Sequence, residues 1–160
     1  MAKDHDIYES KAKMILAKSN YMVVGTSTKN GKPWVAPVMF VHDDNLNLYF
    51  LSAVDALHSK NILENGNVSI SIFDSHQKIG DLEEGIQAEG KATLVEEDNI
   101  ERVISMYHKK AFPGSEKVSK DKNAAESYLG AAEFRFFKVK LISMYVNGED
   151  RRVEVDLPGR

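Results

Sequence analysis

The chain has 160 residues and contains no cysteine, only four prolines, and no apolar run near the roughly 20 residues of a membrane-spanning helix. Without cysteine it has no disulfide, no thiol nucleophile and no cysteine-ligated zinc or iron–sulfur site. The N-terminus, MAKDHDIYESKAK, lacks the apolar core of a signal peptide. A formal net charge of −3 is not typical of proteins that bind nucleic acid or membrane surfaces. We therefore expect a cytoplasmic protein without these partners.

Several catalytic and binding motifs are also missing. The five histidines (His5, His42, His58, His76 and His108) show no helical metal-ligand spacing, and no H-E-x-x-H occurs. There is no G-x-G-x-x-G, no P-loop and no G-x-S-x-G. The sequence therefore predicts no metal site, no Rossmann or Walker-type nucleotide site and no nucleophile elbow.

The composition, 42% hydrophobic and 28% charged, is typical of a globular protein, and the length predicts one domain over residues 1–160. Hydrophobic periodicity predicts helices over residues 7–18, 55–65 and 100–107, with a further helical turn at 124–129. It predicts strands over residues 21–28, 33–41, 46–51, 67–74, 86–94, 132–146 and 153–156. Asp4 or Asp6 is the expected N-cap of the first helix, and Gly66 the expected left-handed residue that closes the second.

The connections predict how these strands pair. Asn30-Gly31 is a strong hairpin signal, because both residues accept positive φ, and Asn147-Gly148 is a second turn signal. The apolar phase slips at Phe136-Phe137, which predicts a β-bulge or a sharp bend. Short hairpins and strands with one apolar face predict a mostly antiparallel, mainly β (α+β) fold, a small closed or split barrel with the helices outside.

One stretch, LSAVDALHSKNI at residues 51–62, gathers polar side chains where a strand gives way to a helix. In the first interpretation they cap the helix: Ser52 and Asp55 resemble a capping box, or Asp55 alone is the N-cap. In the second they bind an anion, because a helix start exposes backbone N–H groups and the positive end of its dipole. Local sequence leaves both interpretations open.

The strand PWVAPVMFV is unusual because it contains two prolines, Pro33 and Pro37. Proline cannot donate to a sheet ladder, so this is either an edge strand or a strand whose backbone is left free to meet a planar ligand. Trp34 is accordingly either a core aromatic residue or a wall of that ligand pocket.

Two other sets of polar residues give weaker indications of function. The lysines at positions 109, 110, 117, 120 and 122 are diluted by acidic residues and lack interleaved aromatics, which predicts a solvated loop. Gln77 and Lys78 follow the strand NVSISIFD, and they matter only if their loop faces the same pocket as Lys60.

The ordered set YMVVGTSTKNGKPWVAPVMFV, LNLYFLSAVDALHSKNI, NVSISIFD and EGKATLV resembles the pyridoxamine 5′-phosphate oxidase-like proteins, the FMN-binding split barrels. The resemblance covers residues 7–96 best. The later pieces, YHKKAFPG and AAEFRFFKVKLISMYVNG, are similar to a small subgroup of that family.

The resemblance implies a six-stranded antiparallel split β-barrel, a homodimer, and FMN bound at the dimer interface. The flavin ring would lie along the strand Trp34 to Met39, and the phosphate would lie near the start of the following helix, with Lys60 as its best ligand. The implied cofactor-binding residues are Trp34, Ala36, Pro37, Val38, Ser52, Ala53, His58, Ser59, Lys60 and Gln77.

The sequence also departs from the oxidase itself. Ser59 stands where that enzyme has an arginine before the phosphate-binding lysine, and its C-terminal substrate-binding arginine and histidine are not evident. We therefore expect an FMN-binding flavoprotein, an oxidoreductase whose substrate need not be a vitamin B6 vitamer and is not identified by the sequence. The alternatives are a non-catalytic flavin-binding or stress-related module, or the same barrel holding deazaflavin F420 or heme. For heme, His58 and His76 are the axial ligands to test.

Overall fold

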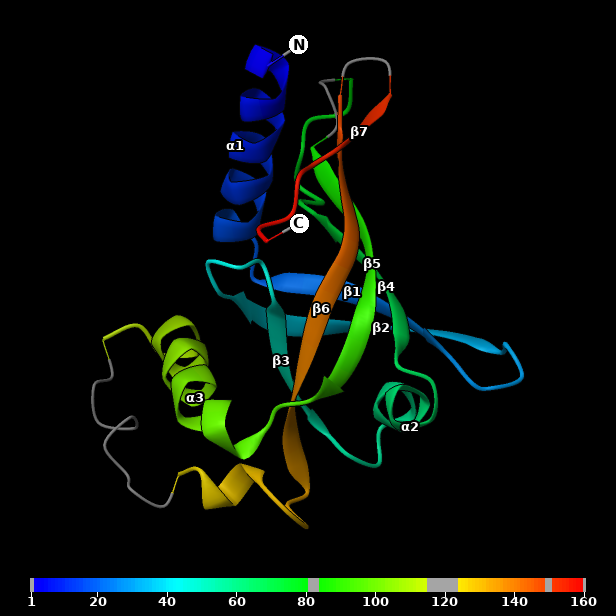
Figure 1. Cartoon of the computed structure of the whole chain (residues 1–160), viewed down its shortest axis with the longest axis vertical. Helices are drawn as coiled ribbons and strands as arrows, with labels where there is room; N and C mark the ends of the chain where they lie inside the picture. The colour runs from blue at the N-terminus through cyan, green and yellow to red at the C-terminus, as the bar shows by residue number, and fades with distance from the viewer. Residues whose placement is uncertain (1, 81–83, 115–123, 149–150, 160) are drawn as a thin grey trace.

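The structure is a computed structural model that describes residues 2–80, 84–114, 124–148 and 151–159. Six antiparallel strands form a barrel, a short seventh strand extends it, and helices pack around the outside (Figure 1). The elements are α1 (Ala2–Lys18), β1 (Tyr21–Ser27), β2 (Pro33–His42), β3 (Leu48–Ala53), α2 (Leu57–Glu64), β4 (Asn67–Phe73), β5 (Gly85–Leu94), α3 (Glu97–Ala111), the 3-10 helix η2 (Glu126–Tyr128), β6 (Phe134–Asn147) and β7 (Arg152–Glu154). None of the helices in these ranges is long and apolar enough to cross a membrane.

The strand order is β3-β2-β1-β4-β5-β6-β7, and a further pairing between β3 and β6 closes the barrel. All of these pairs are antiparallel. The predicted six-stranded antiparallel split barrel is confirmed, and so is the predicted final strand, which pairs with β6 as β7.

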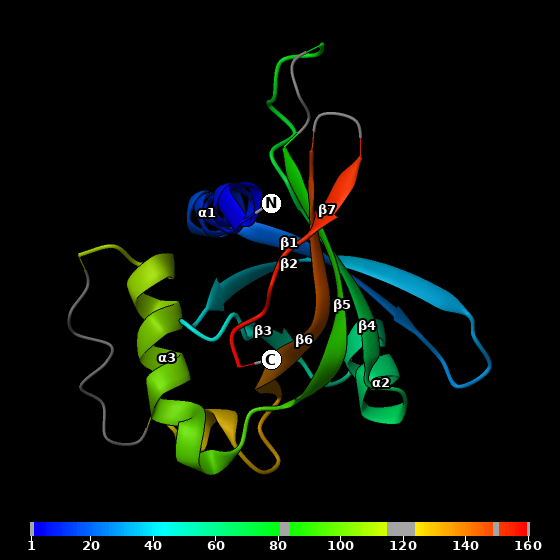
Figure 2. The same ribbon diagram turned by 45° about the horizontal axis from the view of Figure 1, so that its top comes forward.

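Strand β3 changes partners along its length, and this produces the split. It pairs with β2 only over Phe40–His42, whereas all six of its residues pair with β6. The segment of β2 from Pro33 to Met39 pairs with β1 on one side. Within the part of the chain that the structure describes, no strand covers its other side. The barrel therefore presents an unpaired backbone edge beside the point where β2 and β3 separate (Figures 1 and 2).

Two apolar clusters hold the fold together. The barrel interior is filled by alternate strand residues, among them Phe50 and Phe137, whose rings stack with centroids 5.2 Å apart. The second cluster lies between the outside of the barrel and α3, and it includes Tyr49 and Phe136. Phe136 and Phe137 are thus both buried because they face different clusters on opposite sides of β6.

The β-bulge lies elsewhere than the sequence predicts. Glu89 pairs with Ser143 and Gly90 pairs with Leu141, so Ile142 is the extra residue on β6. The apolar phase slip at Phe136-Phe137 reflects two-sided burial and not a bulge. At the bulge the strands approach closely: a Cβ on Gly90 would lie 2.7 Å from the Lys140 carbonyl oxygen.

Several predicted helix boundaries were wrong. Helix α1 begins at Ala2, so Asp4 and Asp6 lie inside it and do not cap it. Helix α2 has Ala56 and not Asp55 as its N-cap, and no side chain caps it. Gly66 does not have a positive φ. The position requires glycine for a different reason: a Cβ there would lie 2.6 Å from the Ala92 carbonyl oxygen.

The two turns that flank β2 also differ in detail. At the β1–β2 turn only Gly31 has a positive φ, of 80°, whereas Asn30 does not. Leu46 has a φ of 59° and belongs to the β2–β3 turn, so β3 begins at Leu48 and runs on through Ala53. Ser52 and Ala53 are therefore the last residues of a strand.

The predicted solvated lysine loop is only partly described. Lys117, Lys120 and Lys122 lie outside the described residues. Lys110 is not solvated: its Nζ donates to the carbonyls of Ser19, at 2.6 Å, and Phe40, at 2.9 Å. Burial lowers the pKa of Lys110 from its ordinary value. The side chain fastens α3 to the start of β1 and to β2.

Candidate functional site

The end of β3 and the first turn of α2 bring three of the expected site residues together. The Ser52 Oγ lies 2.7 Å from His58 Nε2, and the Ser59 hydroxyl donates to Ser52 Oγ at 3.3 Å. Ser59 is fully buried, whereas Ser52 and His58 are half-buried. Ser52 is held in place from the other side by β6, where Arg135 is its strand partner. The result is a compact cluster of two hydroxyls and one imidazole.

The start of α2 beside this cluster has unused hydrogen-bonding capacity. A helix start leaves its first N–H groups without intrahelical partners, and here no side chain caps them. Such groups, together with the helix dipole, favour a bound anion. Of the two interpretations of LSAVDALHSKNI, side-chain capping is therefore wrong, and the anion interpretation stays a prediction. Lys60 is exposed in this first turn, where its ammonium group adds positive charge.

The imidazole of this cluster is electrically neutral at pH 7. Burial lowers the pKa of His58 from its ordinary value of 6.5. The neutral ring has one donor and one acceptor nitrogen, and Nε2 is the nitrogen that faces Ser52. The neutral His58 ring can therefore take part in hydrogen bonds but contributes no charge. The positively charged side chain of this turn is Lys60.

The unpaired edge of β2 is the second part of the site. Ala36 and Val38 are buried, with their side chains toward the barrel core, whereas Pro37 between them is exposed. Trp34 is 47% exposed, so it is not a core aromatic residue. Ala36 and Val38 thus offer a ligand their backbone groups only, while Trp34 offers an exposed ring.

A buried hydrogen-bond chain connects these two parts. Asn61, on α2, donates from Nδ2 to Thr26 Oγ1 at 3.1 Å, and the Thr26 hydroxyl donates to the Trp34 carbonyl at 3.3 Å. Asn61 and Thr26 are only 3% and 5% exposed. Asn65 makes a parallel contact from α2 to Ser27, at 3.0 Å. These asparagines fix the orientation of α2 relative to β1 and β2.

Gln77 lies apart from the other expected residues within one chain. It comes four residues after the end of β4, and β4 ends away from α2 (Figures 1 and 2). Its amide is engaged in its own loop: Nε2 donates to the carbonyls of Asp74 and Glu84, both at 2.8 Å, and Oε1 accepts from the Glu84 N–H. One chain therefore brings Gln77 to neither Lys60 nor the β2 edge.

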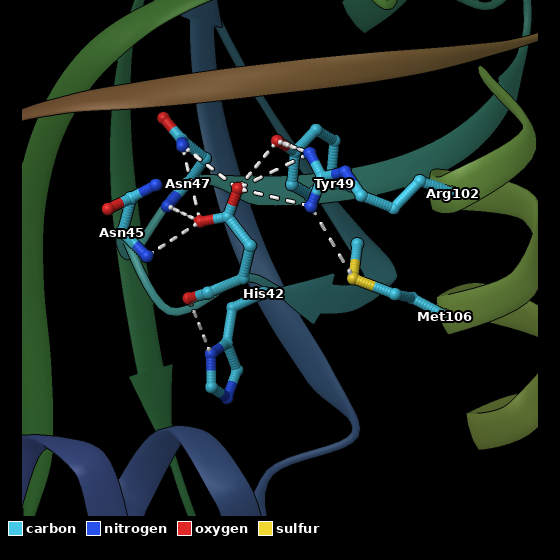
Figure 3. A network of polar contacts seen from close by, with 7 residues as sticks. His42, Asn45, Asn47, Tyr49, Arg102 and Met106 are labelled. Carbon is cyan, nitrogen blue, oxygen red and sulfur yellow. Dashed lines mark hydrogen bonds and ion pairs between the residues drawn. The ribbon is translucent and has the colours of Figure 1, made fainter. Parts of the chain in front are cut away.

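Sequence reasoning missed a polar network that joins the β2–β3 turn to α3 (Figure 3). The Asp43 carboxylate accepts hydrogen bonds from the Asn45 and Asn47 backbone N–H groups and from the Tyr49 hydroxyl at 2.8 Å. Arg102 on α3 donates to Tyr49 Oη at 2.9 Å and lies 3.5 Å from the same carboxylate. The only local signal is the spacing Asp43-x-Asn45-x-Asn47, because Arg102 is 59 residues away.

The network also determines the charge state of Asp43. Burial acts to raise its pKa, but the hydrogen bonds from Asn47 and Tyr49, with the charge of Arg102, bring the pKa below its ordinary value of 3.8. Burial and the hydrogen bond to Asp43 raise the pKa of Tyr49. Asp43 is therefore an anion at pH 7, with the positive charge of Arg102 beside it. No group of three or more metal-ligating side chains was found among the residues for which the structure gives a placement.

A family model described as pyridoxamine 5′-phosphate oxidase matches residues 8–140. The chain belongs to this family. The match runs from within α1 to the middle of β6, and so includes both the β2 edge and the Ser52–His58–Ser59 cluster. No curated protein matches the sequence.

Solved structures share the fold at low sequence identity. HutZ, a heme storage protein from Vibrio cholerae, is 20% identical, with a TM-score of 0.67, over 88% of this chain and 95% of that one. A heme binding protein from Mycobacterium smegmatis is 18% identical, with a TM-score of 0.70, over 91% of this chain and 56% of that one. General Stress Protein 26 from Bacillus anthracis is 20% identical, with a TM-score of 0.60, over 92% of this chain and 98% of that one. At these identities the likeness establishes the fold.

Proposed function

We propose that this protein binds FMN and acts as a flavin-dependent oxidoreductase. The observation that carries the proposal is the pairing of two features in a member of this family. One is the unpaired β2 edge at Pro33–Met39, and the other is the uncapped start of α2 beside Ser52, His58 and Ser59. A flavin mononucleotide has a planar, hydrogen-bonding ring and a dianionic phosphate, so it matches both features.

The residues present fit such a group. The phosphate would be held by the first-turn N–H groups of α2, the Ser52 hydroxyl, the His58 imidazole and the Lys60 ammonium. The fully buried Ser59 would orient the Ser52 hydroxyl from behind. Backbone groups of Ala36 and Val38 and the exposed Trp34 ring would contact the ring system, with Pro37 and Ala53 beside them. Gln77 reaches this site only from a second copy, because its loop lies at the other end of its own barrel.

When bound, the flavin supplies the redox chemistry. The protein would bind the phosphate, orient the ring against β2 and shield one of its faces. A general acid or base from the chain is not required by this proposal.

The test is the absorption spectrum of the purified protein, followed by titration with FMN. We expect a yellow protein, or saturable quenching of FMN fluorescence with a rise in melting temperature, because a ligand that binds only the folded state stabilises it. A colourless protein that neither quenches FMN fluorescence nor gains stability would refute the proposal.

Heme is the second candidate cofactor, and the likeness to a heme binding protein and a heme storage protein of this fold favours it. An axial ligand would be His58 or His76. His58 Nε2 already contacts Ser52, whereas His76 is exposed and its Nδ1 lies 3.2 Å from Asp74. A Soret band on hemin addition that His76→Ala or His58→Ala abolishes would support heme, and a flavin spectrum would exclude it. Deazaflavin F420 is distinguished by the same spectrum.

A non-catalytic, stress-related flavin-binding module is the third candidate, and the likeness to General Stress Protein 26 favours it. Stopped-flow reduction of the bound flavin by reduced nicotinamides separates it from an oxidoreductase. A binding module should react no faster than free FMN.

The homodimer and the cytoplasmic location belong to the same proposal. A cofactor at the interface would explain why the β2 edge is unpaired in one chain and how Gln77 contributes. Light scattering with and without FMN tests the dimer, and cell fractionation tests the location. A monomer in both states would remove Gln77 from the site.

A further inference from the structure

A separate hollow lies on the outside of the barrel, away from the β2 edge. It has a volume of about 580 Å³ and lies between the β2–β3 turn, the outer face of β5 and β6, and the C-terminal tail. Both ribbon views show this tail returning from β7 past β6 toward the β2–β3 turn (Figures 1 and 2). The lining residues that matter here are Asn45, Asn47, Lys91, Lys138, Lys140 and Ile142.

Three lysines face this hollow from neighbouring strands. Lys138 and Lys140 alternate on β6, and Lys91 on β5 is the direct cross-strand partner of Lys140. Side chains two apart on a strand share a face and start about 7 Å apart, and directly paired side chains start about 5 Å apart. Like charges placed directly opposite each other destabilise a sheet. The cluster therefore has a cost in the folded protein that a bound anion would remove.

The described lining of the hollow supplies no acidic side chain to balance this charge. Among the described residues that line the hollow there is no aspartate or glutamate. The Asp43 carboxylate, in the same turn as Asn45 and Asn47, is already engaged by Arg102 and Tyr49. Lys91 has an uncharged neighbour, with its Nζ 3.3 Å from Asn67 Oδ1. In a chain with a net charge of −3, three lysines thus share a hollow whose described lining contains no carboxylate.

Uncharged hydrogen-bonding groups lie at the edge of the hollow. The Asn47 Nδ2 is held by Asp43, and the Asn45 side-chain amide points away from that carboxylate (Figure 3). The remaining wall is apolar, with Ile142, Leu141 and Leu157 beside the lysines. A volume of this size is in the range of small-molecule sites, which combine apolar walls with a few directed polar groups.

We infer that this hollow binds a small molecule that carries two or more phosphate groups. Lys91, Lys138 and Lys140 contact the phosphate oxygens, and Asn45 donates from its amide. Lysine is a compact charge suited to phosphate, and three of them match the charge of a diphosphate better than that of a single carboxylate. The inference does not rest on FMN binding, because the hollow and the α2 start share no residue.

The test is isothermal titration calorimetry of the full-length protein with pyrophosphate, in low-salt buffer and with FMN present to occupy any site at α2. We expect saturable binding with a Kd below about 1 mM. Lys140→Gln and Lys91→Gln should each weaken it by about tenfold. The matched control is Lys32→Gln, at the exposed β1–β2 turn, which should leave the Kd unchanged. Citrate, with a similar charge but only carboxylates, should bind more weakly than pyrophosphate.

Thermal melting supplies a second measurement that keeps the inference testable if a variant changes the fold. Without anion, Lys140→Gln should melt no lower than the parent, because the substitution removes a like-charge pair. With pyrophosphate, the parent should gain more in melting temperature than the variant. Absence of pyrophosphate binding, an equal loss with Lys32→Gln, or equal or tighter binding of citrate would overturn the inference.

Discussion

At the scale of single residues, the candidate FMN site combines side chains that differ in burial and in charge within one helix turn. Ser59 is fully buried, His58 is half-buried and neutral, and Lys60 is exposed. Burial of the hydroxyl fixes geometry, whereas the exposed ammonium group supplies charge without a desolvation cost. These residues can therefore be tested separately, because a change at the exposed position leaves the core intact.

Lys60→Ala should weaken FMN binding strongly. A hydrogen bond to a charged group is worth about 1.5–3 kcal/mol, so we expect the Kd to rise by roughly 10- to 100-fold. The melting temperature without FMN should be unchanged, because the side chain is exposed. Fluorescence titration measures the Kd, and Lys32→Ala is the control. A parent-like Kd in Lys60→Ala would show that this lysine is not a phosphate ligand.

His58 should make the folded protein less stable in mild acid. Its pKa is lowered in the folded state, while the unfolded chain has the ordinary value of 6.5, so below that pH the unfolded state binds the extra proton. The free energy of unfolding should therefore decrease as the pH drops from 6.5 toward the lower pKa that His58 has in the folded protein. Urea unfolding at pH 7.5 and 5.5 measures this difference, which should be smaller in His58→Gln. Equal differences in both proteins would contradict the lowered pKa.

At the scale of elements, polar contacts as well as apolar packing join the helices α2 and α3 to the barrel. Asn61 ties α2 to β1 through Thr26, and Arg102 ties α3 to the β2–β3 turn through Asp43 and Tyr49. Buried polar groups that are fully paired favour one arrangement over others, because any shift leaves a buried group unpaired. Both helices therefore have a defined orientation on the barrel.

Asn61→Ala should destabilise the fold by about 1–3 kcal/mol, since it leaves the buried Thr26 hydroxyl without its donor. The matched control is Asn65→Ala, whose partner Ser27 is more exposed, and its effect should be smaller. Urea unfolding measures both. Because α2 carries His58, Ser59 and Lys60, we also expect Asn61→Ala to weaken FMN binding.

Tyr49→Phe should likewise cost about 1–3 kcal/mol of stability, because the Asp43 carboxylate loses a donor and Arg102 loses an acceptor. Tyr21→Phe, at a side chain that is 63% exposed, is the control and should be close to neutral. Urea unfolding of both variants is the measurement. A cost in Tyr49→Phe no larger than the control's would mean that the network does not fasten α3.

The sequence predicted the elements well where the relevant forces are local. Alternation and turn signals located β1, β2, β4 and β5 to within about two residues, which is the usual scatter of element boundaries. It failed where distant contacts decide the conformation. The Asp43 carboxylate organises the turn that places Leu46 at positive φ, and that carboxylate is held by Arg102 from another element.

The same contrast between local and distant contacts explains which parts of the candidate site could be predicted. Ser52, His58 and Ser59 are neighbours in sequence, so a local pattern sufficed to group them. Thr26 and Asn61 are 35 residues apart, and their hydrogen bond follows from the register of the barrel and not from any motif. The bulge at Ile142 was also missed, because it depends on the register between two strands.

At the scale of the whole molecule, the barrel depends on close strand approach around the bulge. A Cβ on Gly90 would lie 2.7 Å from the Lys140 carbonyl oxygen and 2.8 Å from Val139 Cγ1. Backbone on the opposite strand cannot move aside without disturbing the pairing of β5 with β6. The glycine is therefore required by space and not by backbone conformation.

Gly90→Ala should destabilise the protein by about 1–3 kcal/mol, the usual cost of overpacking a well-packed interior. Gly80→Ala serves as a contrast, because nothing lies near that position but its φ of 96° strains any side chain. Urea unfolding measures both effects. The two should differ in hydrogen exchange: Gly90→Ala should loosen the amides of β5 and β6, whereas Gly80→Ala should affect only its loop. Unchanged protection in β5 and β6 would contradict this view of the bulge.

The pairing of β3 with β6 has a consequence for the order of folding. Leu48 to Ala53 must find Phe134 to Val139, so the last closure joins segments more than 80 residues apart. Contacts of large sequence separation carry a large loop-closure entropy and form late. Ser52 is one of the residues that this step immobilises, through its partner Arg135. We therefore expect the β6 side of Ser52 to be fixed late in folding, and on a ribosome only after β6 has emerged. A cofactor bound there would slow unfolding without accelerating the earlier folding steps.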